Sequence, residues 1–195
     1  MSHFEFIFSL LSLLLGFVLV EVLRGFVRAI KAGRTHGAED TPIRVGVLTR
    51  LLAVFVMMDV ASYWALAWDL RDSLPIGPDT VFAGLLISGT YYFSASMIFP
   101  DDLKEWPNLD EWFWTNRRRI LACIIALNCV TVATMFFASG LKGPVWGHAV
   151  EQGIYFVPLI IAAWSRNRWL VGSMLGLLIF CFLLAAVGTL VGRLI

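Results

Sequence analysis

The sequence carries little charge and lacks the short motifs that mark most enzyme active sites. Only 15% of its 195 residues are charged, whereas 59% are hydrophobic. It has no glycine-rich phosphate loop, nucleophile elbow, H-E-x-x-H or C-x-x-C, and no filter-like repeat of the potassium-channel kind. These absences predict a protein that is not an enzyme and that holds no cofactor.

Metal ligands and nucleic-acid signals are also scarce. The three cysteines lie in apolar stretches at spacings that match no zinc or haem pattern. His148 and Glu151, three residues apart, could supply two ligands to a divalent metal, with His3 and Glu5 near the chain start as the other two. Two helical ligands and a chain end do not define a site, so we predict no metal. The net charge of +1 gives no reason to expect nucleic acid.

Long apolar segments are what the chain does contain. About 20 mostly apolar residues are enough to cross a bilayer, and the connections between these segments are too short to form a second domain. We therefore predict an all-α fold: a polytopic membrane protein with six transmembrane helices in one bundle, as a single domain over residues 1–195. The predicted spans are residues 4–26, 45–70, 80–99, 120–138, 146–164 and 169–191, and residues 100–119 form a cytoplasmic interfacial segment.

Lysine and arginine gather in alternate connections between these spans. Of the 15 basic residues, only Arg71, Lys142 and Arg193 fall on the opposite side. Basic loops are retained in the cytoplasm. Both termini are therefore predicted to face the periplasm or exterior, with the lipid bilayer as the main partner.

Asp59 interrupts the second span and is the best functional clue in the chain. Counted at ~1.5 Å per residue, it lies ~12 Å from the cytoplasmic edge of a ~30 Å apolar core. An ionised carboxylate at that depth is costly, so it is expected to be paired, protonated or hydrated for a purpose. Similar depths are predicted for Tyr91, Tyr92, Asn128 and Tyr155. This polar level is either a proton or ion relay, or a set of interhelical hydrogen bonds that fix the packing.

A second charged group is predicted at the cytoplasmic mouth. Glu21 and Arg24 lie three residues apart near the inner end of the first span, so they can pair along one helical face. Arg50 enters the second span at a similar depth and is an alternative partner. The pair would either stabilise the mouth or gate it.

Glycine pairs in the last span predict close helix contacts. Gly172 and Gly176 form one pair, and Gly188 and Gly192 form another. Small residues four apart allow two helices to approach closely in a membrane. At ~100° per residue the two pairs lie on nearly opposite faces. One is expected inside the bundle and the other against a partner, in a homo-oligomer or a larger membrane complex.

Four features of the first 120 residues form a recognisable set. They are residues 4–16 (FEFIFSLLSLLLG) followed by Glu21 and Arg24, the tryptophans that end the second span, residues 99–101 (FPD) and residues 112–119 (WFWTNRRR). In these features the chain resembles a family of small bacterial inner-membrane proteins with no assigned activity. The resemblance implies a helical bundle in the bacterial inner (cytoplasmic) membrane and supplies no activity.

Two functions remain open at this point. The first is permeation or relay of protons, ions or a small solute past Asp59. The second is a non-catalytic accessory subunit that packs into a larger complex through its glycine faces. The first is preferred, because an accessory subunit has no evident need for an acid at the membrane midplane.

Overall fold

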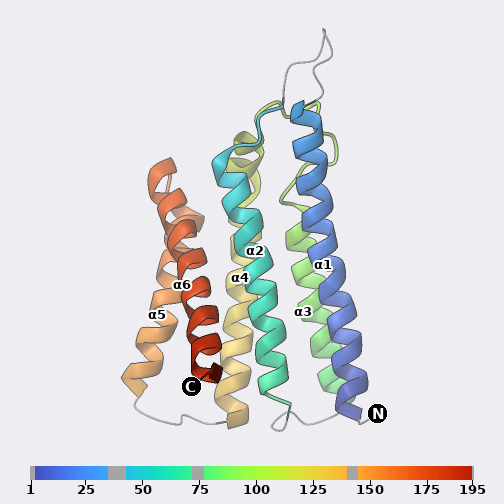
Figure 1. The fold of residues 1–195 in the computed structure, drawn as a ribbon, viewed down its shortest axis with the longest axis vertical. Helices are drawn as coiled ribbons and strands as arrows, with labels where there is room; N and C mark the ends of the chain where they lie inside the picture. The colour runs from blue at the N-terminus through green and yellow to red at the C-terminus, as the bar shows by residue number, and fades with distance from the viewer. Residues whose placement is uncertain (1–2, 35–42, 72–76, 140–144, 195) are drawn as a thin grey trace.

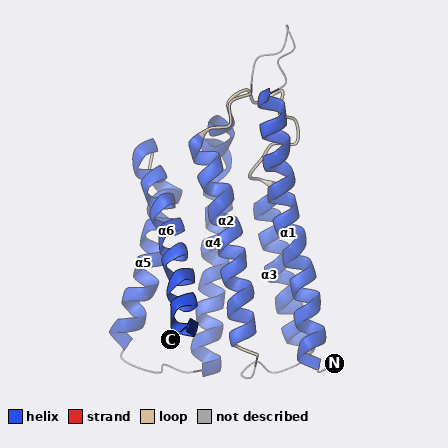
Figure 2. Cartoon of the chain, viewed as in Figure 1, coloured by secondary structure: helices blue, strands red, loops and turns tan. Residues whose placement is uncertain are grey.

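Six helices make up the fold. The computed structural model describes residues 3–34, 43–71, 77–139 and 145–194. Within these residues there is no strand and only one isolated bridge, between Arg44 and Asn108, so the predicted all-α fold is confirmed (Figure 2). The helices are α1 (His3–Arg34), α2 (Val47–Asp69), α3 (Pro78–Ser96), α4 (Leu109–Ser139), α5 (Val145–Trp164) and α6 (Arg168–Leu194).

The helices stand side by side and alternate in direction (Figure 1). α2 and α4 lie in the middle, with α1 and α3 on one side and α5 and α6 on the other. In the described parts of the chain, α2 packs against α1, α3, α4 and α6, whereas α5 packs against α4 and α6 alone. Both chain ends lie at one end of the bundle, opposite the connection from α3 to α4. A side chain on α2 can therefore reach most of the other helices.

Three helices are long and apolar enough to cross a membrane in the part of the chain that the structure describes. These segments are Glu5–Gly33 of α1, Val47–Asp69 of α2 and Arg168–Gly188 of α6, and α5 adds a shorter apolar stretch, Gln152–Trp164. The outer surface of the bundle also carries large apolar side chains, such as Leu86 on α3, which is 73% exposed. Such a surface is typical of a membrane protein. Crossing by all six helices stays a prediction.

A residue of α4 caps the start of α2. Asp110 Oδ1 accepts a hydrogen bond of 3.2 Å from the backbone N–H of Thr49, in the first turn of α2. The Thr49 hydroxyl donates to the Leu109 carbonyl at 2.9 Å. Gly46, just before α2, leaves room for this contact, because a Cβ there would overlap the Asp110 carboxylate. A carboxylate at a helix N-terminus satisfies free N–H groups and complements the helix dipole.

The apolar core fills the middle of the bundle. Its largest fully buried side chains come mainly from the two central helices, α2 and α4, and others come from α5, α6 and the α3 segment. The bulk of these side chains holds α2 at a fixed rotation, so that the face carrying Asp59 points inward. The core includes Leu52 and Phe55 of α2, Leu121 and Ile124 of α4, Leu159 of α5 and Leu175 of α6.

Candidate functional site

Asp59 lies inside the bundle and accepts hydrogen bonds from three other helices. Its side chain is only 1% exposed. Tyr91 of α3 donates to Oδ2 at 2.8 Å, and Tyr155 of α5 donates to Oδ1 at 2.6 Å. The amide of Asn128 on α4 lies 3.3 Å from Oδ2. Four helices therefore meet at one carboxyl group, and we call Asp59, Tyr91, Asn128 and Tyr155 the Asp59 cluster.

The helical faces explain why these four side chains meet. Asp59 lies three residues from Val56 and four from Phe55, both of which are fully buried, so it shares their inward face. Tyr91 lies likewise between Ser88 and Ala95, which are also buried. A polar group on such a face meets other side chains rather than lipid.

Asn128 links the members of the cluster to one another. Its side-chain nitrogen lies 2.9 Å from the Tyr155 hydroxyl and 3.0 Å from the Ile124 carbonyl on its own helix. The Tyr155 proton is then directed at Asp59, whose bond of 2.6 Å has the length of a charge-assisted O–H···O⁻ hydrogen bond. Within the described residues, Asp59 has no bond to lysine or arginine. Neutral donors alone satisfy the carboxyl group, which can therefore hold a charge or exchange a proton with its neighbours.

Tyr92 does not join this cluster, and its predicted place there needs correction. It is 46% exposed, whereas the adjacent Tyr91 is 1% exposed. Neighbouring residues on a helix point about 100° apart, so both tyrosines lie at one level but only one faces Asp59. Tyr63, four residues beyond Asp59 on the same helical face, borders the cluster. Its ring centre lies 5.9 Å from that of Tyr91.

The two sides of the Asp59 cluster differ. Toward the basic end of the bundle, the next turns of α2 place Leu52, Phe55 and Val56, all at most 1% exposed. Toward the other end, Tyr63 and Ala67 border a cavity between α1, α2, α3 and α4. The cluster is therefore sealed by packed apolar side chains on the basic side and lies next to a cavity on the other.

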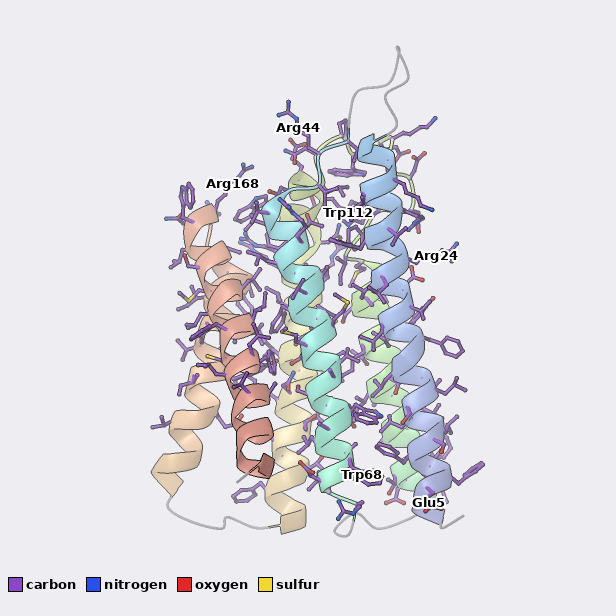
Figure 3. The ribbon with its side chains drawn as sticks, viewed as in Figure 1. Glu5, Arg24, Arg44, Trp68, Trp112 and Arg168 are labelled. Carbon is purple, nitrogen blue, oxygen red and sulfur yellow. The ribbon has the colours of Figure 1, made fainter. Side chains whose placement is uncertain are left out.

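The predicted pair at the inner mouth is not formed. Arg24 is exposed and extends away from the bundle (Figure 3), and neither it nor Glu21 makes a side-chain hydrogen bond or ion pair with another described residue. Arg50 donates instead from Nε to the Gly46 carbonyl of its own helix start, at 3.2 Å. A spacing of three residues allows contact, but an exposed arginine gains more from solvent than from a surface pair.

The basic end of the bundle contains a buried arginine instead. Arg117 of α4 donates from Nη2 to the Ser165 carbonyl just after α5, and its guanidinium carbon lies 3.7 Å from the centre of the Trp114 ring. Burial, aided by the neighbouring Arg118, lowers the pKa of Arg117 to about 10. The group thus stays protonated at neutral pH and interacts favourably with the C-terminal end of α5. The buried position of Arg117 was not predicted from the sequence.

The glycines of α6 differ in their surroundings. A Cβ on Gly172 would lie 3.4 Å from Leu48 Cδ2, so this glycine faces α2. A Cβ on Gly176 or on Gly188 would meet nothing within 4 Å. Gly192 lies outside the residues whose side chains are described.

Three of the four suggested metal ligands, among them His3, have side chains outside the described residues. The side chains of His148 and Glu151 fall outside the described set, although both residues belong to α5. The described residues contain no group of three or more histidine, cysteine, aspartate or glutamate side chains that could hold a metal ion.

Comparisons with known proteins do not identify the chain. No protein-family model matches it, and it has no significant match to a curated protein or to a solved structure. The resemblance to small bacterial inner-membrane proteins therefore stays a prediction. What the molecule does has to be inferred from its own residues.

Proposed function

We propose that the chain is a six-span protein of the bacterial inner (cytoplasmic) membrane that relays protons, ions or a small solute past Asp59. One observation carries this proposal. A buried carboxyl group accepts hydrogen bonds from Tyr91, Asn128 and Tyr155, which come from three other helices. A carboxyl group at membrane depth is costly, and such residues commonly mark proton or ion pathways.

Proton relay is the simplest form of this function. Asp59 can take up a proton and become neutral. Its O–H group can then donate a hydrogen bond to the hydroxyl oxygen of Tyr91 or Tyr155, each of which donates to the carboxyl group in the structure. The phenol of Tyr63 lies against Tyr91 and extends the row of polar groups away from the basic end of the bundle. On the basic side, Leu52 and Phe55 block water. Release to the basic side therefore requires these side chains to separate, which makes the apolar seal the gate.

Proton flux into proteoliposomes tests this function. An acidification assay driven by a potassium diffusion potential should report flux for the wild-type protein and none for Asp59→Asn, which keeps the shape but cannot titrate. Glu21→Gln is the matched control, because it removes an acid of α1 that has no partner in the described residues. It should keep wild-type flux. Equal flux through wild type and Asp59→Asn would reject the relay.

A non-catalytic accessory subunit that packs into a larger membrane complex is the second candidate. It is supported by the open glycine positions of α6, since Gly176 and Gly188 have space beside them that no described side chain fills. Close approach of another helix to such positions drives association in membranes. Native mass spectrometry should give the mass of the assembly, and Gly188→Leu should release the partner. Gly89→Leu, at an equally open position of α3, should leave the mass unchanged.

A further inference from the structure

A cavity of about 140 Å³ lies beside the Asp59 cluster, between α1, α2, α3 and α4. It extends from Leu70, just after α2, and Thr80, in the first turn of α3, to Tyr63, four residues beyond Asp59 on α2. Its walls are mostly apolar, formed for example by Leu11 and Ile87. An apolar cavity of this kind excludes water but accepts apolar molecules.

The polar groups of the cavity wall are satisfied, with one exception. The hydroxyls of Thr131 and Thr134 donate to carbonyls of their own helix, at 2.9 Å each. The hydroxyl of Tyr63 makes no hydrogen bond with any described residue, although its ring packs 5.9 Å from that of Tyr91. An unpaired hydroxyl in an apolar environment is unfavourable, so a partner for it is expected from outside the chain.

The size and the free hydroxyl together indicate the ligand. An apolar cavity of about 150 Å³ in another protein stays dry and binds benzene. We propose that this cavity binds a single six-membered ring that carries one hydroxyl or carbonyl oxygen, with the oxygen bonded to Tyr63 and the ring among the apolar side chains. Such a ligand touches Tyr63, which packs on a member of the Asp59 cluster. This binding does not depend on the relay function proposed above.

Binding of 4-fluorophenol to the purified protein in detergent tests the proposal by fluorine NMR. The wild-type protein should shift the fluorine resonance in a saturable way beyond the effect of empty micelles. Ala67→Phe should abolish the saturable shift, because Ala67 lines the cavity and is only 8% exposed. Ala65→Phe is the matched control, since Ala65 is exposed on the same helix two residues away, and it should bind as the wild type does.

The hydroxyl of Tyr63 is tested with a second ligand and a second variant. Tyr63→Phe should weaken the binding of 4-fluorophenol by roughly two- to tenfold, which corresponds to the loss of one hydrogen bond. Fluorobenzene, which has no hydroxyl, should bind wild type and Tyr63→Phe equally. This comparison needs no large residue in the cavity, so it holds even if Ala67→Phe does not fold.

Two results would overturn the proposal: no saturable binding to the wild-type protein, or a folded Ala67→Phe that binds as the wild type does. Equal losses for both ligands in Tyr63→Phe would overturn the role of the hydroxyl. A free ring and a ring carried on a membrane lipid share this chemistry. If 4-nonylphenol displaces 4-fluorophenol, the natural ligand is a ring carried on a membrane lipid, because the nonyl chain must leave the cavity toward the bilayer. Its failure to compete would assign the free ring.

Discussion

Tyr155 donates a hydrogen bond of 2.6 Å to Asp59 although their helices are not neighbours. Within the described residues, α5 packs against α4 and α6, and its backbone does not come close to that of α2. The long phenol spans this gap, and Asn128 of the intervening α4 bonds to both side chains. The cluster thus links α2 to α5 through polar side chains rather than through direct packing of the two helices.

Removing one phenol hydroxyl from this cluster should destabilise the fold. Tyr155→Phe and Tyr91→Phe each remove a donor from a buried carboxyl group, which should cost about 1–3 kcal/mol. Thermal unfolding in detergent would measure the loss. Tyr92→Phe is the control. It should leave the stability of the fold unchanged, because this adjacent tyrosine is exposed.

The loss should shrink when Asp59 is already neutral. In an Asp59→Asn background, the phenols no longer serve a carboxylate, so Tyr155→Phe should cost less than it does in the wild type. This double-mutant comparison isolates the pair. Additive losses would mean that the Tyr155 hydroxyl acts through Asn128 rather than through Asp59, because the phenylalanine ring keeps the packing against Phe182.

The sequence is enough to bring most of this cluster together, because apolar spans have a known rise per residue and depth can be counted. Counting gives the level of a side chain but not its direction, which is why Tyr92 was included. The direction was available in the small residues of α3. Tyr91 shares a face with Ser88 and Ala95, three and four residues away, and small residues line helix contacts.

Contacts at the ends of the helices could not be predicted from the sequence. Thr49 and Asp110 are 61 residues apart and meet only because α2 and α4 start at the same end of the bundle. Nothing in either segment signals the other. The pair of Glu21 and Arg24 shows the converse, since favourable spacing did not overcome the exposure of the arginine.

Asp110 should stabilise α2 from outside that helix. Asp110→Ala removes the acceptor of the Thr49 N–H and should cost about 0.5–2 kcal/mol, as loss of an N-cap does. Gly46→Ala should also destabilise, because its methyl group would overlap the Asp110 carboxylate. Thermal unfolding would measure both changes.

Two further variants control this prediction. Gly46→Ala should cost less in the presence of Asp110→Ala, since the overlap is then gone. Gly16→Ala places the same methyl group where nothing lies within 4 Å, and it should leave the fold equally or more stable. If Gly46→Ala were as harmless as Gly16→Ala, the cap would not exist in solution.

Replacement of Arg117 should destabilise the fold even when the new residue is lysine. Its planar guanidinium stacks on Trp114 and reaches the Ser165 carbonyl, and a lysine ammonium cannot do both. Arg117→Lys should lower stability by about 1–2 kcal/mol, the sum of a hydrogen bond and a cation–π contact. Arg118→Lys, at the exposed neighbouring position, should have no effect in the same unfolding assay. Equal responses would show that charge alone matters at this end.

Cysteine labelling should establish which end of the bundle faces the cytoplasm. The basic residues gather at the end where Arg44 and Arg168 lie, opposite Glu5 and Trp68 (Figure 3). By the rule that positive loops stay inside, we predict that this end faces the cytoplasm.

The labelling must start from a variant without cysteine, because Cys129 is exposed in the wild type. In intact bacteria, a membrane-impermeant maleimide should label Asp79→Cys, at the start of α3, and should leave Glu111→Cys, at the start of α4, unlabelled. Both side chains are exposed, so burial does not explain a difference. Permeabilised cells should label both. The reverse pattern would invert the orientation, and the apolar seal beside Asp59 would then face the periplasm.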